Sequence, residues 1–198
     1  MRQGITALRY LMSSIAISLA FSLVGFAQQA AGGAPQTPPK LADYPAARAE
    51  GLAREWTRAR DYTKEFLDAM PEDGYAFKPS PDIRSFAEQM LHLAGGNYGI
   101  GSRATGATNA MVGKNLEKDE AKTKAAVTKA VLDSYDFVIA SVKGLTDTKL
   151  DERVPVAGMN RPRSVVLAAA FEHQTHHRGQ TVIYLRLKGV QPPSEKLF

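Results

Sequence analysis

Hydrophobic residues recur every three or four positions in four long segments of the chain, which is the spacing of one face of an α-helix. The predicted helices cover, in order, residues 44–70, with the start at Asp43 or Tyr44, then 86–104, 116–143 and 164–188. Regular alternation of apolar and polar residues is not evident elsewhere. The pattern therefore predicts an all-α four-helix bundle of the up-and-down type, with a long connection before the last helix.

Several residues at the ends of these segments are typical of helix termini. Ser85 and Glu88 form a capping box, in which each side chain binds a backbone N–H group that the helix leaves free. Ser164 is the predicted N-cap of the last helix, and Gly189 is its predicted left-handed stop. The first half of this helix (SVVLAAAF) is apolar almost all round and is expected to be deeply buried. Acidic residues such as Glu117 suit the positive end of the third predicted helix.

The connections between the predicted helices are rich in proline and glycine. Residues 71–82 form a loop, in which Tyr75-Ala76-Phe77 is expected to seal one end of the bundle. Residues 144–163 form the long connection. Within it, Val154-Pro155-Val156 reads as a short extended piece, and 158–163 as a basic, flexible stretch.

The first 27 residues resemble a secretory signal peptide. Arg2 and Arg9 give a positive start, Leu11–Phe26 is uncharged and mostly apolar, and Gly25-Phe26-Ala27 suits cleavage. This run of about 16 residues is shorter than the ~20 needed to span a bilayer. We therefore expect cleavage rather than anchoring.

The remaining chain divides into a tether and one domain. Residues 28–43 are rich in proline, alanine and glycine, and 44–198 form the predicted bundle. A bacterial Sec-type signal would make the protein secreted or periplasmic, with no stable membrane anchor after cleavage.

Charge and cysteine content exclude several classes of function. The formal net charge is +5, and without Arg2 and Arg9 the 25 basic residues become 23 against 20 acidic ones, a net charge of +3. This small excess, spread as mixed signs, does not indicate a nucleic-acid partner. The absence of cysteine excludes disulfides and thiolate ligands. A metal bound by imidazole is then zinc or nickel in our prediction, with iron as a further candidate.

Three of the four histidines lie in Phe171–Gln180 (FEHQTHHRGQ). Residues four apart on a helix lie above one another, so His173 and His177 can share one ion. His92, in the second predicted helix, can supply a third ligand from a facing helix. The spacing therefore predicts a metal site of three imidazoles with an open coordination position.

His176 is a rival ligand, because residues three apart also share a helix face. One apolar stripe of the last helix places His177 toward the core, and another, only slightly weaker, places His176 there. The two stripes are Val166, Ala170, His173, His177, Gln180 and Tyr184, and Ala169, His176, Ile183 and Leu187. Geometry alone leaves both histidines open.

Three glycines follow His92 in the second predicted helix. Gly95, Gly96 and Gly99 each cost about 1 kcal/mol relative to alanine in a helix. A close approach of another helix, or space for a molecule at the site, would offset this cost. The alternative is that the helix frays after Gly95.

The run His173–Gln180 (HQTHHRGQ) resembles the HxxxHRGQ signature of the DinB-like (damage-inducible B) family. Ser85–Tyr98 (SFAEQMLHLAGGNY) is similar to the second helix of that family, and Gly189–Ser194 to its closing segment. The likeness covers roughly Tyr44–Ser194. It implies a four-helix bundle that holds a divalent metal on three histidines, here His92, His173 and His177, and that His176 is not a ligand.

Some members of this family are metal-dependent transferases or isomerases that use low-molecular-weight thiols. An exported protein meets little reduced thiol, so the simplest expectation is a metal-dependent hydrolase acting on an unknown small molecule. Glu172 or Glu88 is a candidate general base and Arg178 a candidate anion-binding group, although surface pairing or support of the ligands also suits Glu172 and Arg178. The alternatives are a non-catalytic metal or small-ligand binder of the cell envelope and a bundle whose histidines bind nothing. A homodimer through a bundle face is also possible.

Overall fold

The computed structural model describes residues 48–119 and 121–197. The predicted signal peptide, the tether and the start of the first helix lie outside these residues. Within them the chain is mostly helical, and the bundle predicted from the sequence is confirmed. Its elements are α1 (Arg48–Ala69), the short 3₁₀ helix η2 (Glu72–Gly74), α2 (Phe86–Thr105), α3 (Leu116–Asp119), α4 (Lys124–Lys143), α5 (Asp147–Asp151), β1 (Arg153–Val156), β2 (Met159–Pro162) and α6 (Arg163–Leu187).

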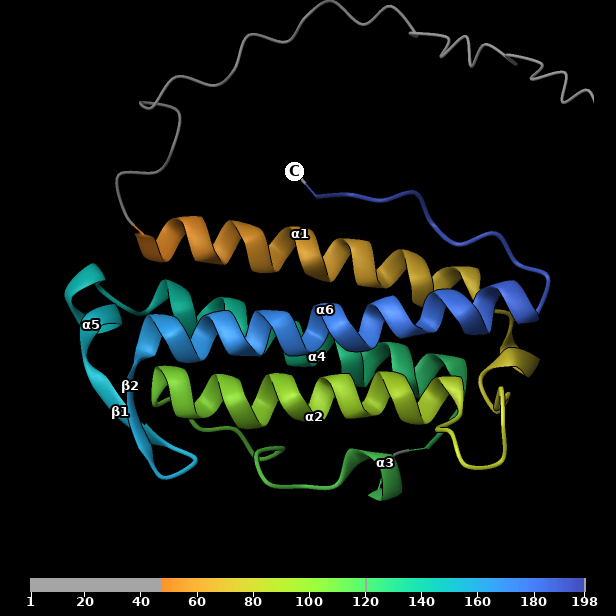
Figure 1. The fold of residues 1–198 in the computed structure, drawn as a ribbon, viewed down its shortest axis with the longest axis horizontal. Coiled ribbons are helices and arrows are strands. Elements are labelled where there is room, and N and C mark those ends of the chain that lie inside the picture. The colour runs from red at the N-terminus through yellow and green to blue at the C-terminus, as the bar shows by residue number, and fades with distance from the viewer. Residues whose placement is uncertain (1–47, 120, 198) are drawn as a thin grey trace, which may run out of the picture. The chain divides into compact units, whose positions relative to one another are not determined.

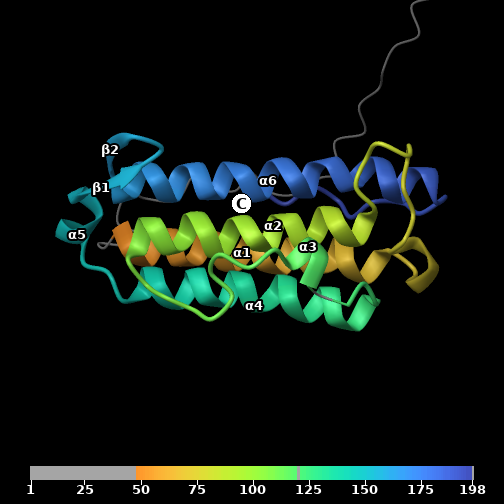
Figure 2. The same cartoon turned by 90° about the horizontal axis from the view of Figure 1, so that it is seen from below.

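The long helices α1, α2, α4 and α6 lie side by side and enclose the core (Figures 1 and 2). Helix α2 packs mainly against α6 and α4, and α1 packs mainly against α4. The order departs from a simple up-and-down bundle in one respect, because α2 and α4 run in the same direction (Figure 1). Residues 106–119 run back along α2 and carry α3, which packs against α2 (Figure 1).

The core forms where the apolar stripes of the four long helices meet. Trp56 is fully buried on α1, and its ring makes edge contacts with Tyr135 of α4 at 5.8 Å and Phe171 of α6 at 5.5 Å between centroids. Edge-to-face pairs of this kind add about 0.5–1.5 kcal/mol to the stabilisation from burial. The apolar side chains at positions 56, 59 and 66 of α1 are buried, whereas Leu52 is half-buried.

The predicted third helix is interrupted, so the expectation of one helix over 116–143 was wrong. Leu116–Asp119 forms one turn, and α4 begins at Lys124. The Thr123 hydroxyl caps α4 by accepting a hydrogen bond from the backbone N–H of Ala126 at 3.3 Å. Because Thr123 has extended backbone angles at this cap, the helix cannot continue through it.

The connection before α6 contains a β-hairpin. The extended piece predicted at 154–156 is confirmed as part of β1, but residues 159–162, predicted as flexible, pair with it as β2. Ala157 and Gly158 both have positive φ, at 48° and 75°. Two consecutive residues with positive φ make the tight turn that suits a hairpin.

Two expectations for α6 were wrong. Ser164 is not its N-cap, because the helix begins at Arg163 directly after β2, and the Arg163 N–H donates instead to the Glu152 carbonyl at 2.9 Å. The apolar first half of α6 is not buried all round, since Val165, Ala168 and Ala169 are exposed. The predicted stop is confirmed, with Gly189 at φ 73°.

The loop between α1 and α2 seals one end of the bundle, as predicted. Tyr75 is buried and its hydroxyl donates to the Leu67 carbonyl at 2.9 Å. Phe77 packs against Tyr184 of α6, with ring centroids 6.5 Å apart. This closure fixes the start of α2 relative to the end of α6.

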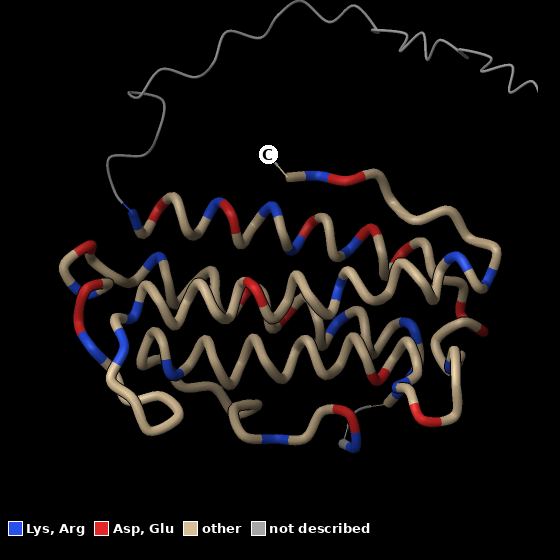
Figure 3. Tube along the Cα trace, viewed as in Figure 1, with Lys and Arg blue, Asp and Glu red and all other residues tan. Residues whose placement is uncertain are grey.

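Charged side chains are distributed unevenly over the helices. They alternate in sign along α1 and are scarce on α2 (Figure 3). Helix α2 packs against α6, α4 and α3. Among the described helices, none combines the length and the apolar character that a membrane span requires.

Candidate metal centre

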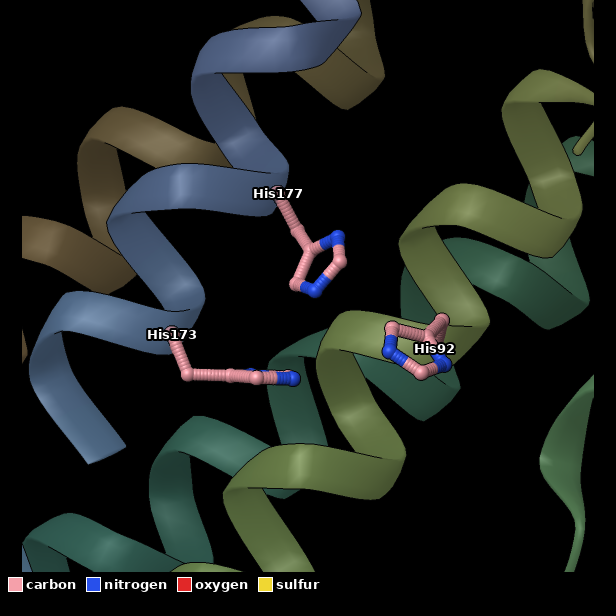
Figure 4. Close-up of side chains that lie close together, drawn as sticks. All are labelled: His92, His173 and His177. Carbon is pink, nitrogen blue, oxygen red and sulfur yellow. The ribbon is translucent and has the colours of Figure 1, made fainter. Parts of the chain in front are cut away.

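Two helices bring three histidines together near the middle of the bundle. The predicted capping box is present: the Glu88 N–H donates to the Ser85 hydroxyl at 3.2 Å, and the Ser85 N–H donates to the Glu88 carboxylate at 2.8 Å. It sets the start of α2 and so the direction of His92. His173 and His177 project from successive turns of α6 toward His92 (Figure 4).

The three rings are close enough to share one ion. Ring centroids are 4.4 Å apart for His173 and His177, 4.5 Å for His92 and His177, and 5.4 Å for His92 and His173. One nitrogen from each ring can be chosen so that all three lie within 4.8 Å of one another. A tetrahedral zinc site needs nitrogens about 3.3 Å apart. Small rotations of the side chains would close this gap.

His176 and His177 differ in their exposure to solvent. His177 is only 8% exposed and lies among the core-facing residues of α6 with Val166, Ala170 and Tyr184. His176 is exposed, as are Ala169, Ile183 and Leu187 on the rival stripe. The group that could hold a metal therefore contains His92, His173 and His177 and not His176.

Gly96 makes room for His173. A Cβ atom at this position would lie 2.1 Å from Cε1 and 2.4 Å from Nδ1 of the His173 ring. The helix does not fray at the glycines but continues to Thr105. The close approach expected from the sequence is thus an approach of an imidazole ring to the backbone of α2.

Glu117 holds His92 from outside the bundle. Its Oε1 atom lies 2.7 Å from His92 Nδ1, and Arg84 Nε donates to its Oε2 at 2.7 Å. Burial raises the pKa of Glu117, but the hydrogen bonds from Arg84 and His92 outweigh burial and leave the pKa below its ordinary value. The ionised carboxylate keeps the proton of His92 on Nδ1, which leaves Nε2 for a metal.

The sequence showed Glu117 only as an acidic residue near a helix start. Its role depends on the crossing segment that carries α3 back over α2. No local pattern of the sequence indicates that contact.

Two glutamines support His177. The Gln89 amide nitrogen lies 2.9 Å from His177 Nδ1 and also contacts the amide oxygen of Gln180. The Gln180 amide nitrogen in turn lies 3.0 Å from His176 Nε2. An ion on His177 Nε2 requires a proton on Nδ1, so the Gln89 amide would have to turn over for its oxygen to accept that proton. Gln89 was not a candidate from the sequence, although it lies three residues before His92.

His173 differs from the other two ligands because its Nδ1 atom is buried without a hydrogen-bond partner. Such an orphaned atom is uncommon in folded proteins. Burial, followed by the nearby His92, lowers the pKa of His173, and burial, followed by His173 and His92, lowers the pKa of His177 to about 4. Neutral imidazole is the form that binds metal, so the surroundings, the donor types and the spacing all fit a divalent ion.

Neither Glu88 nor Glu172 belongs to the group that could hold a metal. Glu88 is held by Ser85 and by Lys78 at 3.3 Å. Glu172 is exposed on α6 and lines a different groove, between α1 and α6.

Arg178 is a core residue and not a surface group. It is 7% exposed, its Nη1 donates to Gln174 at 3.0 Å, and its guanidinium lies 4.6 Å from the centre of the Tyr62 ring. Among the described residues no carboxylate pairs with it. Burial lowers its pKa.

Cavities lie on both sides of the histidine group. One, of 330 Å³, is bordered by His92, His173 and residues of the 113–117 segment. The other, of 740 Å³, is bordered by Arg84, Gln89, Gln180 and the apolar side chains of α6 beyond them. Glu117 borders both. Of the two, the smaller cavity is the one that borders histidines, so a molecule bound in it would lie beside His92 and His173.

Comparison with known proteins gives the same fold. A DinB-like protein from Bacillus cereus ATCC 10987 superposes with a TM-score of 0.62 at 22% identity, covering 74% of this chain and 97% of that one. The crystal structure of YjoA from Bacillus subtilis superposes with a TM-score of 0.57 at 19% identity, covering 74% and 96%. At these identities the likeness shows the fold alone.

Sequence comparison extends the likeness. The uncharacterized protein YjoA of Bacillus subtilis (strain 168) is 23% identical over 133 residues, which are 66% of this chain and 84% of YjoA. The uncharacterized protein YrdA of the same organism is 35% identical over 68 residues, which are 32% of this chain and only 41% of YrdA. The sequence model of the DinB family matches residues 46–197, a range that contains every described residue. The chain belongs to the DinB family.

Proposed function

We propose that this protein is a metal-dependent enzyme, a hydrolase or transferase, that holds zinc or nickel, or else iron, on His92, His173 and His177. The observation that carries the proposal is the convergence of three imidazoles from two helices, with ligand atoms within 4.8 Å of one another. Three protein ligands leave a coordination position open, as in catalytic rather than structural zinc sites.

An ion held in this way supplies a Lewis acid that activates water or polarises a carbonyl or phosphoryl oxygen. The chain's own residues prepare the site for it. Glu117 orients His92, and Gln89 orients His177, so that both rings present a nitrogen inward. The carboxylate of Glu117 also borders both cavities, where it can accept a hydrogen bond from an O–H or N–H group of a bound molecule.

We further propose that the enzyme acts outside the cytoplasm. The support is the sequence of residues 1–27, with its positive start, apolar run and small residues before the predicted cut. Intact-mass analysis of protein from the cell envelope or medium tests this proposal. A mature N-terminus near Gln28 is expected, and recovery of full-length chain from the cytoplasm alone would contradict it.

The catalytic proposal is tested by turnover. The purified protein is screened against esters, amides and phosphoesters, and against thiol-transfer substrates, with and without a chelator. We expect an activity that the chelator removes, that the metal restores and that His92→Ala abolishes. Stoichiometric metal without any chelator-sensitive turnover would instead indicate a non-catalytic metal or small-ligand binder.

A further inference from the structure

The smaller cavity beside the histidines, here called the glycine cavity, is bordered by His92, His173, Gly95, Gly99 and Lys114 among others, and has a volume of 330 Å³. This volume is near the lower end of the range of about 300–1,000 Å³ found for ligand pockets. Because two of the three candidate metal ligands border it, a molecule inside it lies beside the ion. A volume of this size suits a small molecule.

Gly95 and Gly99 have no structural explanation in the packing of the protein. Both lie inside α2, where glycine is less stable than alanine. A Cβ atom on either residue would meet no heavy atom within 4 Å. Gly96, between them, is explained by the His173 ring. Gly95 and Gly99 leave this part of the cavity wall without side chains.

The charges around the glycine cavity favour an anion. Among the described residues no carboxylate pairs with the side chain of Lys114. The acid on the wall, Glu117, is already held by His92 and Arg84. With a divalent ion in place, positive charge exceeds negative charge on the walls, and the surplus attracts a negative ligand.

We propose that the glycine cavity binds a small anion, a carboxylate or a phosphate, between the metal and Lys114. This inference rests on the metal-dependent function proposed above and specifies its substrate class. The anionic group meets the ammonium of Lys114, and the reacting group of the molecule lies at the open coordination position. The bare wall of α2 admits the rest of the molecule.

The test uses the full chain loaded with cobalt(II), whose visible absorption reports changes at the metal, titrated with succinate and with inorganic phosphate. We expect saturable binding of at least one of them. Succinate alone would indicate a carboxylate substrate, and phosphate alone a phosphoryl substrate. Binding of neither would overturn the inference.

Substitutions separate the cavity from the metal itself. Gly99→Leu fills the cavity and Lys114→Met removes its cation, and each should weaken anion binding at least tenfold with unchanged cobalt content. Gly179→Leu is the matched control, because Gly179 is an exposed glycine of α6 with no heavy atom within 4 Å of a Cβ and is not among the cavity residues. Both leucine variants should raise the melting temperature, so that weaker binding in Gly99→Leu cannot be ascribed to unfolding.

The outcomes distinguish the two proposals. If the unmodified protein binds no cobalt, the metal site fails and this inference fails with it. If cobalt binds but Gly99→Leu and Lys114→Met both keep the anion affinity of the unmodified protein, the metal site stands and the glycine cavity is not the anion site.

Discussion

Gly96 provides a sharp test of the geometry, because one methyl group at this position should remove a metal ligand without unfolding the protein. A Cβ atom would lie 2.1 Å from Cε1 of His173. Real Cβ contacts essentially never fall below 3.0 Å, so the ring must withdraw by about 0.9 Å. Metal–nitrogen bonds of ~2.0–2.1 Å tolerate only about 0.2 Å. The His173 ring must therefore leave its present position, and we expect Gly96→Ala to weaken its bond to the metal.

The expected magnitude follows from the loss of one ligand of three. Loss of a residue that merely supports a ligand weakens metal binding by about 10–100-fold, and loss of the ligand itself should reach at least the upper end of that range, ~2.7 kcal/mol. The same substitution should not lower the stability of the metal-free protein by a comparable amount, because alanine is favoured over glycine in a helix by about 1 kcal/mol.

The assay is zinc affinity by competition with a fluorescent chelator, with the melting temperature of the metal-free protein measured alongside. Gly96→Ala, His173→Ala and the double variant form a cycle. We expect all three to bind zinc equally weakly, because the methyl group has nothing left to displace once the ring is gone. Gly95→Ala, whose Cβ meets open space, is the control and should bind as the unmodified protein does. Normal zinc affinity in Gly96→Ala would refute the placement of His173.

Three further predictions concern the groups around the ligands. Glu117→Gln should weaken zinc binding by about 10–100-fold, because it removes the charge that orients His92; a chelator competition that shows no change would contradict this role. In the metal-free protein the pKa of His177 is lowered to about 4, so the unfolded chain binds its proton more readily, and the free energy of unfolding should fall as the pH decreases from ~6.5 toward 4. Urea denaturation at several pH values measures this dependence, and His177→Asn should reduce it. Arg178→Met should keep full metal content and change the free energy of unfolding by less than about 1 kcal/mol, because no carboxylate loses its partner; a loss above ~3 kcal/mol by denaturation would mean that an unseen partner exists.

Local sequence patterns predicted the long helices and the grouping of the three histidines, because the signals lie within a few residues. The Ser85–Glu88 capping box set the start of α2, and the i, i+4 spacing of His173 and His177 placed two imidazoles on one face. The choice of His177 over His176 required knowing which face of α6 is buried, since the two candidate stripes have similar apolar content. Packing against α2 decides between them, and a single sequence does not show it.

The missing parts of the prediction all depend on contacts between distant segments. Glu117 reaches His92 only because the crossing connection folds back over α2. The break before Thr123 could not be seen because residues 117–124 contain no proline or glycine and consist mostly of residues that suit an exposed helix face. The hairpin turn at Ala157 was missed because a non-glycine residue rarely adopts positive φ. Gln89 acquires its role only when α6 lies beside it.

The central claim is that His92, His173 and His177 hold one metal ion, and elemental analysis of the full-length protein as isolated tests it most directly. We expect about one divalent ion per chain in the unmodified protein and in His176→Ala, and almost none in the alanine variants of the three ligands. Full metal content in all three ligand variants, or none in the unmodified protein, would contradict the site.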